Sequence, residues 1–424
     1  MVKNKLFKVI ETFSGIGAQA KALENINAKF EIVNTADWDI TAIIAYYAIH
    51  NYSPEHQQKY QSVSDEDIDY FLSKLTLSND GKKTLTKNNY KRLNKQIKRL
   101  LFIAIKESKN LVSITDIHGN NIQNDIDLFT YSFPCQDLSL CGCWTGNKSG
   151  IARDAHNRSG MLWEVERILL EMFNSGRTMP KFLLMENVPN ILSDRHAADF
   201  QSWKDSLTGM GYYNHIYVLD ARNFGGLQKR RRAYMISIQT HNNEKINNKL
   251  ETYFNKNNLE DKRFNPSETS KPHTLNQVLC TNYSNKKYRQ EALSSIPNDT
   301  PSRREIWDDN MHLLDDDFRP KKILVECVTT KQDRNPNSGL VKMPAELITP
   351  GKSSWRYLTP REALMLMGFD RSDYDKIIKL NIETKKNHYL YNNEKILKLA
   401  GNSIVVDVLQ EIFKQIIYIQ SNIL

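Results

Sequence analysis

The sequence predicts an α/β fold, with an open sheet and a smaller, loop-rich second domain. The first observation is a strand over residues 5–13 that runs through a glycine turn into a helix over residues 18–26. Strand, glycine turn and helix form the arrangement that cradles nucleotides in such sheets. The second is a pair of apolar runs, at 126–131 and 181–188, each typical of a buried strand. The third is the loss of strand–helix alternation after His241, which predicts the second domain.

The composition is that of a folded protein with a moderate positive charge. Of the 424 residues, 40% are hydrophobic and 25% are charged, which excludes a disordered chain. The 58 basic and 49 acidic residues leave a net charge of +9, which favours a polyanionic partner without requiring one. No stretch approaches the ~18 apolar residues of a membrane span.

The start of the chain and its cysteines both indicate the cytoplasm. The first residues contain no apolar segment of a signal peptide, and Glu11 arrives too early for one. The cysteine spacing matches neither a CxxC pair nor a zinc ribbon, so we expect free thiols in a reducing compartment and no metal site. The five cysteines are Cys135, Cys141, Cys143, Cys280 and Cys327.

Cys135 is the first candidate for chemistry. Pro134 stops the strand that contains Tyr131, because proline cannot donate to a strand ladder. Cys135 therefore follows the carboxyl end of a strand, where open α/β sheets place their chemistry. A thiolate there could act as a nucleophile, although a lone cysteine is more often a buried structural residue.

The glycine turn and the strand after it indicate a nucleotide site. Gly15 and Gly17 permit a tight turn and a close backbone approach, but a plain strand–helix turn fits the pattern nearly as well. The next strand, 30–36, ends at Asp37, where an acidic residue commonly binds ribose hydroxyls. Trp38 either stacks on a purine or is a half-buried core residue.

Residues 53–110 are rich in Lys and Asn and poor in core residues, so we expect an insertion at the rim of the sheet. Its lysines suit a solvated face better than a specific site, with phosphate contacts as the alternative. Residues 113–117 are then expected to form a short strand end that carries one carboxylate, Asp116.

Two further segments complete the expected edge of the sheet. The polar, glycine-containing residues 137–158 predict a mobile loop beside the candidate nucleophile. An amphipathic helix over residues 161–173 follows, and the strand after it runs into Glu186 and Asn187. A carboxylate at this strand end either shares the pocket of the cysteine or caps a neighbouring element.

A basic run at residues 228–232 precedes another predicted strand, 234–238. Strand alternation places Gln228, Arg230 and Arg232 on one face. That spacing suits recognition of phosphate or of a polar base edge, and the alternative is an ordinary basic turn.

The second domain offers fewer regular signals. Residues 323–330 form its clearest predicted strand, and a polar loop over residues 331–339 follows. Thr359 and Glu362 match a capping box, so a helix is expected to begin there. Residues 400–403 are expected to start a final amphipathic helix.

Eight short motifs occur along the chain in this order: FSGIG, ADWD, TDI, FPCQDLS, MENV, QKRRR, LTPREA and GNS. Their order and spacing closely resemble those of the bacterial DNA cytosine-5 methyltransferases, over residues 7–240 and 355–424. The resemblance implies a Rossmann-like S-adenosylmethionine-dependent methyltransferase domain at residues 1–240, completed by residues 396–424. Residues 241–395 then hold the target-recognition domain and a connecting helix.

The resemblance also implies S-adenosylmethionine as the cofactor and S-adenosylhomocysteine as its product. The residues that match cofactor-binding positions are Phe13, Gly15, Gly17, Asp37, Trp38, Asp116, Ile117 and Asn402. The first three match the methionine end, and the Asp37–Trp38 pair matches the ribose and adenine contacts. Asp37 stands where glutamate is usual, and Ala18 stands where a second glycine is common.

By the same resemblance, Cys135 is the nucleophile and Glu186 belongs to the base-holding motif. Arg230 and Arg232 match two arginines that support Glu186 and a flipped base. Leu138 departs from the phenylalanine that is frequent at its position, but no departure removes a catalytic group. The expected nucleic-acid contacts are Gln136, Ser139, Asn187, Gln228, Thr329 and Thr330.

The expected chemistry explains why these groups are needed. A thiolate that adds to cytosine C6 makes C5 nucleophilic, which is covalent catalysis. Negative charge then spreads over O2 and N3, where a protonated Glu186 and the Arg232 guanidinium would stabilise it. The base must leave the duplex to react, so the loop that begins at Gln136 is the natural lid.

The expected partner is double-stranded DNA at the nucleoid, with a monomeric enzyme and a restriction endonuclease that acts separately. Two alternatives remain open at this point. One is a transfer-RNA cytosine-5 methyltransferase of the same fold. The other is a DNA-binding regulator without activity, against which the intact Cys135, Glu186 and arginines argue.

Overall fold

The computed structural model describes residues 6–134, 151, 160–265, 274–333 and 338–424. The described chain divides into two compact units, and each is considered by itself. The first unit comprises Met1–Leu219, Arg231–Lys262 and Leu409–Leu424, and the second comprises Asp220–Arg230 and Arg263–Val408. Within the described ranges, no helix has the length and apolar character needed to cross a membrane.

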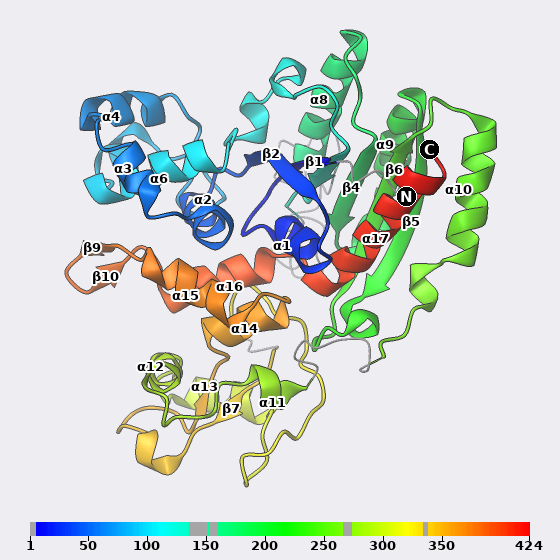
Figure 1. Cartoon of the computed structure of the whole chain (residues 1–424). Helices are drawn as coiled ribbons and strands as arrows, with labels where there is room; N and C mark the ends of the chain where they lie inside the picture. Colours follow the sequence, from blue (N-terminus) through cyan, green and yellow to red (C-terminus); the bar gives the residue numbers. More distant parts are fainter. Residues whose placement is uncertain (1–5, 135–150, 152–159, 266–273, 334–337) are drawn as a thin grey trace. The chain divides into compact units, whose positions relative to one another are not determined.

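The first unit is built on a six-stranded sheet with the order β2-β1-β3-β4-β6-β5 (Figure 1). Strands β2, β1, β3 and β4 are parallel, and β6 is antiparallel to β4. The predicted α/β class is therefore confirmed. The strands are β1 Phe7–Thr12, β2 Phe30–Ala36, β3 Leu128–Tyr131, β4 Phe182–Asn187, β5 Tyr212–Asp220 and β6 Arg231–Gln239.

Helices pack apolar side chains onto this sheet. The predicted amphipathic helix is α8, Met161–Asn174, and its Leu162, Val165 and Ile168 join a buried cluster with Phe129 of β3. Such burial of apolar area is the main stabilising contribution of the layer. The other helices of this layer are α1 Ala18–Asn25, α2 Ile40–Tyr46 and α9 Ala197–Gly209.

The boundaries of the units differ from the expected ones at 240 and 396. Helix α10, Glu244–Lys256, belongs to the first unit because Phe254 stacks on His215 of β5, with ring centroids 3.9 Å apart. The last helix, α17 Val406–Asn422, enters the same unit at Leu409. Its Gln415 accepts from the Tyr217 hydroxyl at 3.1 Å, which ties it to β5.

The expected insertion at 53–110 is a helical subdomain of the first unit. Its helices are α3 Glu55–Lys59, α4 Asp65–Ser73, α5 Lys87–Lys91 and α6 Lys95–Glu107, and a π-helix over Tyr47–Asn51 precedes them. Figure 1 shows α3, α4 and α6 grouped beside α2. The chain leaves α6 along the edge strand β2, where the Leu111 amide donates to the Thr35 carbonyl at 2.8 Å.

The prediction of a short strand at residues 113–117 is wrong. Residues Ile114–Asp116 form a 3-10 turn instead. Val112 has a φ of 67°, and its amide donates to the Asn110 side chain at 2.7 Å. This left-handed residue ends the extended backbone before a strand can form.

The second unit is loop-rich, as expected. Its helices and strands are α11 Leu275–Val278, α12 Lys286–Ser294, α13 Pro301–Asp308, α14 Pro360–Leu366, α15 Arg371–Lys379, α16 Asn393–Asn402, β7 Val341–Lys342, β8 Trp355–Arg356, β9 Glu383–Lys385 and β10 His388–Tyr389. The strand expected at 323–330 is reduced to a single bridge between Val325 and Gln228.

The predicted capping box that opens α14 is confirmed. The Thr359 hydroxyl accepts from the Glu362 amide at 3.2 Å, and the Glu362 carboxylate accepts from the Thr359 amide at 2.8 Å. Glu362 is fully buried and also forms a two-armed ion pair with buried Arg356, at 2.8 Å through each nitrogen. The helix start is thus held by charge-assisted bonds as well as by the cap.

Candidate active site

The candidate site gathers at one edge of the sheet in the first unit. Strands β1, β2, β3 and β4 are parallel, so their carboxyl ends share this edge. The glycine turn follows β1, Asp37 follows β2, and Glu186 lies at the end of β4. Antiparallel β6 begins at the same edge, because Asn187 of β4 pairs with Ala233.

The glycine turn is held in a left-handed path. Phe13, Gly15 and Gly17 have φ values of 53°, 53° and 78°, a region that glycine adopts without strain. A Cβ on Gly17 would lie 2.3 Å from His50 Nε2, so glycine is required there by packing as well. The His50 ring itself bonds the Ile16 carbonyl at 3.0 Å and thereby fixes the turn.

Asp37 shapes the turn from the neighbouring strand. Its carboxylate accepts from the Gly15 amide and from the Asp39 amide, each at 2.9 Å. The Asp37 amide in turn donates to the Asn110 side chain at 3.2 Å. Trp38 next to it is half-buried. The sequence placed Asp37 and Trp38 at this edge, and the structure adds the bond that joins Asp37 to the turn.

Glu186 and Arg232 form an ion pair across β4 and β6. Arg232 Nε lies 3.3 Å from Glu186 Oε1, and the two side chains are 17% and 12% exposed. The partial burial of both side chains makes their attraction stronger than that of a pair at an open surface. The structure thus brings Glu186 and Arg232 together, while their roles in catalysis stay a prediction.

Asn187 is a structural link at the same edge. It is 2% exposed, its amide nitrogen donates to the Phe133 carbonyl at 3.2 Å, and its oxygen accepts from the Val188 amide at 2.8 Å. Phe133 stands two residues before Cys135 in the sequence. Asn187 therefore joins the end of β4 to the backbone that leads to the candidate nucleophile. Cys135, Gln136 and Ser139 themselves lie outside the described residues.

Gln228 is placed differently from its predicted role in base recognition. The residue is fully buried in the second unit. Its amide nitrogen donates to the Leu366 carbonyl at 2.7 Å, and its oxygen accepts from the Val328 amide at 3.0 Å. Both ends of the side chain are thus committed to the protein backbone, which corrects the prediction of a nucleic-acid contact.

Arg230 also lies within the second unit, where it is 5% exposed. Its guanidinium donates to the carbonyls of Val328, Gly401 and Ser403 at 3.0, 3.0 and 2.8 Å. These bonds connect the segment before β6 to the end of α16. The predicted common face of Arg230 and Arg232 is not formed, because β6 begins only at Arg231.

The remaining predicted residues are distributed over both units. In the first unit, Asp116 is exposed in its 3-10 turn, whereas Ile117 is buried. In the second unit, Asn402 is exposed at the end of α16. Thr329 and Thr330 are half-buried in a segment that packs on Gly401, where a Cβ would lie 2.5 Å from the backbone of either threonine.

A family comparison agrees with this arrangement. The family model for C-5 cytosine-specific DNA methylases matches residues 7–81 and 75–418, which is nearly the whole chain. The chain belongs to the C-5 cytosine-specific DNA methylase family. This family implies an S-adenosylmethionine-dependent methyltransferase with a DNA substrate. The predicted activity, DNA cytosine-5 methylation, is confirmed.

Two bacterial relatives match the methylase over its full length. The orphan methyltransferase M.SssI of Spiroplasma monobiae is 32% identical over 423 residues, which cover 98% of each chain. The type II methyltransferase M2.ScrFI of Lactococcus lactis is 31% identical over 411 residues, which cover 97% of this chain and 99% of the relative. Among solved structures, the S. pombe Dnmt2 methyltransferase has a TM-score of 0.54 at 16% identity, covers 97% of this chain and 98% of its own, and so shares the fold.

The glycine turn of the methylase has room for the cofactor that its family implies. Among the described residues, nothing lies within 4 Å of the position that a Cβ on Gly15 would take. Phe13 and Gly15 are half-buried, and the turn lies at the carboxyl edge, the place where nucleotide-like ligands bind open α/β sheets. The residues present therefore fit the cofactor.

Sequence reasoning missed Glu11 in the methylase. This carboxyl group is fully buried in β1, two residues before Phe13. Burial raises its pKa to about 7, although the His50 ring and the Tyr46 hydroxyl lower it. An acidic residue directly after the apolar pair Val9–Ile10 of a predicted strand was the available signal. Glu11 thus adds a buried carboxyl group with a raised pKa to the strand that leads into the turn.

Proposed function

We propose that the protein methylates C5 of a cytosine that has been flipped out of duplex DNA, with Cys135 as the nucleophile. The observation that carries this proposal is the bond from Asn187 to the Phe133 carbonyl. It holds the end of β4, with the Glu186–Arg232 pair, next to the backbone that continues to Cys135. A nucleophile, a carboxyl group and a guanidinium are the three groups that addition to cytosine requires.

The steps follow from the chemistry of the base. The Cys135 thiolate adds to C6 and leaves C5 nucleophilic, while negative charge spreads over N3 and O2. We propose that Glu186 enters the reaction in its protonated form and donates its proton to a hydrogen bond with N3, which stabilises the negative charge of the adduct. Arg232 then faces the charge on O2. Once C5 carries the new methyl group, a water accepts the C5 proton and the thiolate leaves C6, which restores the aromatic ring.

S-adenosylmethionine would supply the methyl group. We propose that the turn of Phe13, Gly15 and Gly17 holds its methionine end and that Asp37 and Trp38 hold its nucleoside. The Asp37 carboxylate already braces the turn through the Gly15 amide, so one residue orients both ends of the cofactor site. Asp116, Ile117 and Asn402 are proposed as further contacts on the basis of their matching motifs.

The second unit is proposed to read the target sequence. Thr329 and Thr330 are the proposed contacts, and their backbone is held firmly against Gly401. We propose a monomer that acts on double-stranded DNA at the nucleoid as part of a restriction-modification pair. The full-length match to a type II methyltransferase supports that biological setting.

Bisulfite sequencing of DNA from cells that express the protein tests this function. The wild-type chain is expected to leave protected cytosines within one short sequence, and the Cys135→Ser variant is expected to leave none while it still binds DNA. Transfer RNA from the same cells should carry no additional 5-methylcytosine. Methylation that persists in Cys135→Ser would contradict the role of the thiol, and methylation of transfer RNA alone would exclude the DNA substrate.

A further inference from the structure

The segment Lys82 to Arg92 is a concentration of free positive charge in the first unit. Five of its eleven residues are basic and none is acidic. The basic residues are Lys82, Lys83, Lys87, Lys91 and Arg92, and all five are exposed. Across the described part of the chain, no side-chain hydrogen bond or ion pair engages any of them.

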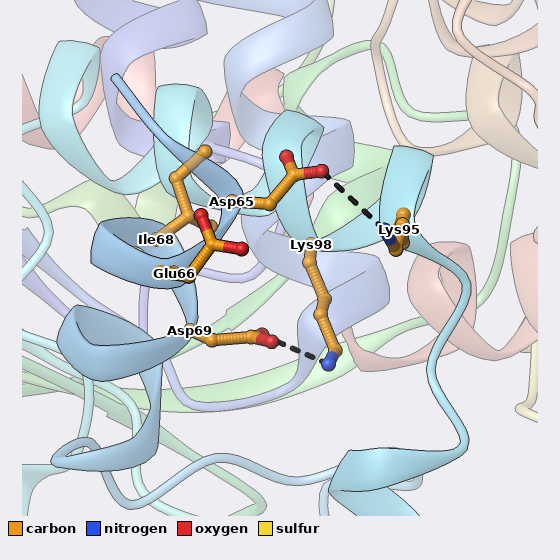
Figure 2. A pocket seen from close by; sticks show the side chains of 6 residues that line it. All are labelled: Asp65, Glu66, Ile68, Asp69, Lys95 and Lys98. Atoms are coloured by element: carbon orange, nitrogen blue, oxygen red, sulfur yellow. Dashed lines mark ion pairs between the residues drawn. The ribbon is translucent and has the colours of Figure 1, made fainter.

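The cations that follow in α6 are neutralised instead. Figure 2 shows Asp65 of α4 paired with Lys95 and Asp69 paired with Lys98, at 3.7 and 2.8 Å. Arg99 also pairs with Asp65, at 2.7 Å. The Arg99 guanidinium lowers the pKa of Asp65, and the Lys98 ammonium lowers that of Asp69.

These pairs line a small pocket of about 90 Å³ between α4 and α6 (Figure 2). Its two lysines are therefore engaged by carboxylates of the protein. The same ion pairs hold α6, which follows the basic segment in the sequence, against α4. Tyr90 adds to this anchor, because its hydroxyl donates to Asp69 at 2.8 Å. The cations of α6 are therefore paired with carboxylates, whereas the basic residues of Lys82–Arg92 are not.

The start of the segment is fixed to the candidate active-site edge. The Ser78 amide donates to the Trp38 carbonyl at 2.8 Å, and the Ile40 amide donates to the Ser78 carbonyl at 2.9 Å. The Ser78 hydroxyl donates to the Lys83 carbonyl at 2.6 Å. The Asp80 carboxylate accepts from the Lys82 and Lys83 amides at 2.9 and 3.1 Å. The first lysines are thus held next to the Asp37–Trp38 end of β2.

We propose that the segment Lys82–Arg92 is a second DNA-binding surface, which contacts phosphates outside the recognised sequence. Five like charges in eleven residues repel one another, and a polyanion removes that repulsion. Lysine suits a phosphate contact without base recognition, because its ammonium group is a compact point charge. The start of this surface is tied through Ser78 to the end of β2, in the unit that would take up the flipped base, so this inference rests on the proposed function.

The test compares two variants that each lose three exposed lysines. One is Lys82→Gln/Lys87→Gln/Lys91→Gln. The matched control is Lys245→Gln/Lys249→Gln/Lys256→Gln, on α10, where the three lysines are equally exposed and make no ion pair within the described residues. Affinity for a long duplex of about ten helical turns is measured against salt concentration, next to a short duplex that barely exceeds the target sequence.

The first variant should bind the long duplex more weakly. Its slope of log affinity against log salt should fall by up to about 2.7, which is 0.9 for each lost phosphate contact. Its kcat and its affinity for the short duplex should stay at the wild-type values, which shows that the catalytic function is intact. The α10 control should match the wild type in every measurement.

Three results would overturn the proposal. One is an unchanged salt slope on the long duplex. Another is an equal loss of affinity for the long duplex in the α10 control, which would show that the effect comes from the net charge of the protein alone. The third is weaker binding of transfer RNA with unchanged binding of DNA, because the surface would then serve another polymer. Loss of activity on the short duplex in all proteins, the wild type included, would instead contradict the proposed function.

Discussion

Two basic runs of this methyltransferase look alike in sequence and differ in what their cations touch. In residues 228–232, Lys229 pairs with Glu326 and Arg232 pairs with Glu186. Arg230 donates to three backbone carbonyls, and Arg231 alone of the four cations is exposed without a side-chain partner among the described residues. In residues 82–92, none of the five exposed cations has a partner among the described residues. Basic side chains that are paired within the protein stabilise the fold or take part in the chemistry. Basic side chains without such partners can bind the substrate.

The comparison also separates two neighbours within the first run. Arg232 meets a carboxylate at the active-site edge of the first unit, and Arg230 meets carbonyls within the second unit. A guanidinium beside a reacting carboxyl group acts on charge that changes during catalysis. One that binds buried carbonyls acts on the folded state at every step. Replacement of Arg232 should therefore lower mainly the catalytic rate, and replacement of Arg230 should lower mainly the stability of the fold.

The largest effect is expected at Arg232. Arg232→Ala removes the partner of Glu186, so kcat should fall by about 10²- to 10³-fold, as for other groups that stabilise developing charge. Single-turnover methylation of a target duplex measures the effect. Arg232→Lys keeps the charge and should recover part of the rate. A kcat within about twofold of wild type in Arg232→Ala would show that the ion pair has no role in the reaction.

A smaller effect on rate and a larger one on stability are expected at Arg230. Arg230→Met keeps most of the volume but leaves three buried carbonyls without their donor. We expect a loss of about 2–4 kcal/mol in the free energy of unfolding, the range for losing several bonds to a charged group. Urea unfolding gives this number, and active-site titration gives the rate per folded molecule. Full stability with a rate as low as that of Arg232→Ala would reverse the two assignments.

The triple variant of the segment 82–92 is the mildest perturbation. It should leave both kcat and stability unchanged and alter only the salt dependence on long DNA. The three results together would separate a chemical, an architectural and a substrate-binding use of basic residues within one chain.

Local sequence signals predicted the fold well. The apolar runs, the glycine turn and the Thr359 capping box depend on residues that are close in sequence, and each forms as expected. The prediction of a short strand at 113–117 was wrong because Val112, a single residue with a left-handed conformation, ends the extended backbone. No periodicity signals such a residue in advance.

The sequence predicted which types of residue lie at the candidate site, but it predicted less well which groups their side chains contact. Glu186 and Arg232 form an ion pair across the neighbouring strands β4 and β6. Gln228 and Arg230 bind backbone groups about 100 to 170 residues away, and strand alternation carries no information on such contacts. The buried position of Glu11 likewise depends on Tyr46 and His50, which follow a complete strand and helix.

Trapping with 5-fluorocytosine tests the central claim most directly. A target duplex carrying this base is incubated with the protein and S-adenosylmethionine, and the denatured complex is digested and mapped by mass spectrometry. Because the C5 fluorine cannot be removed as a proton, we expect a covalent adduct on Cys135 that survives denaturant. The absence of a denaturant-stable complex, or an adduct on Cys141 or Cys143 instead, would contradict the account.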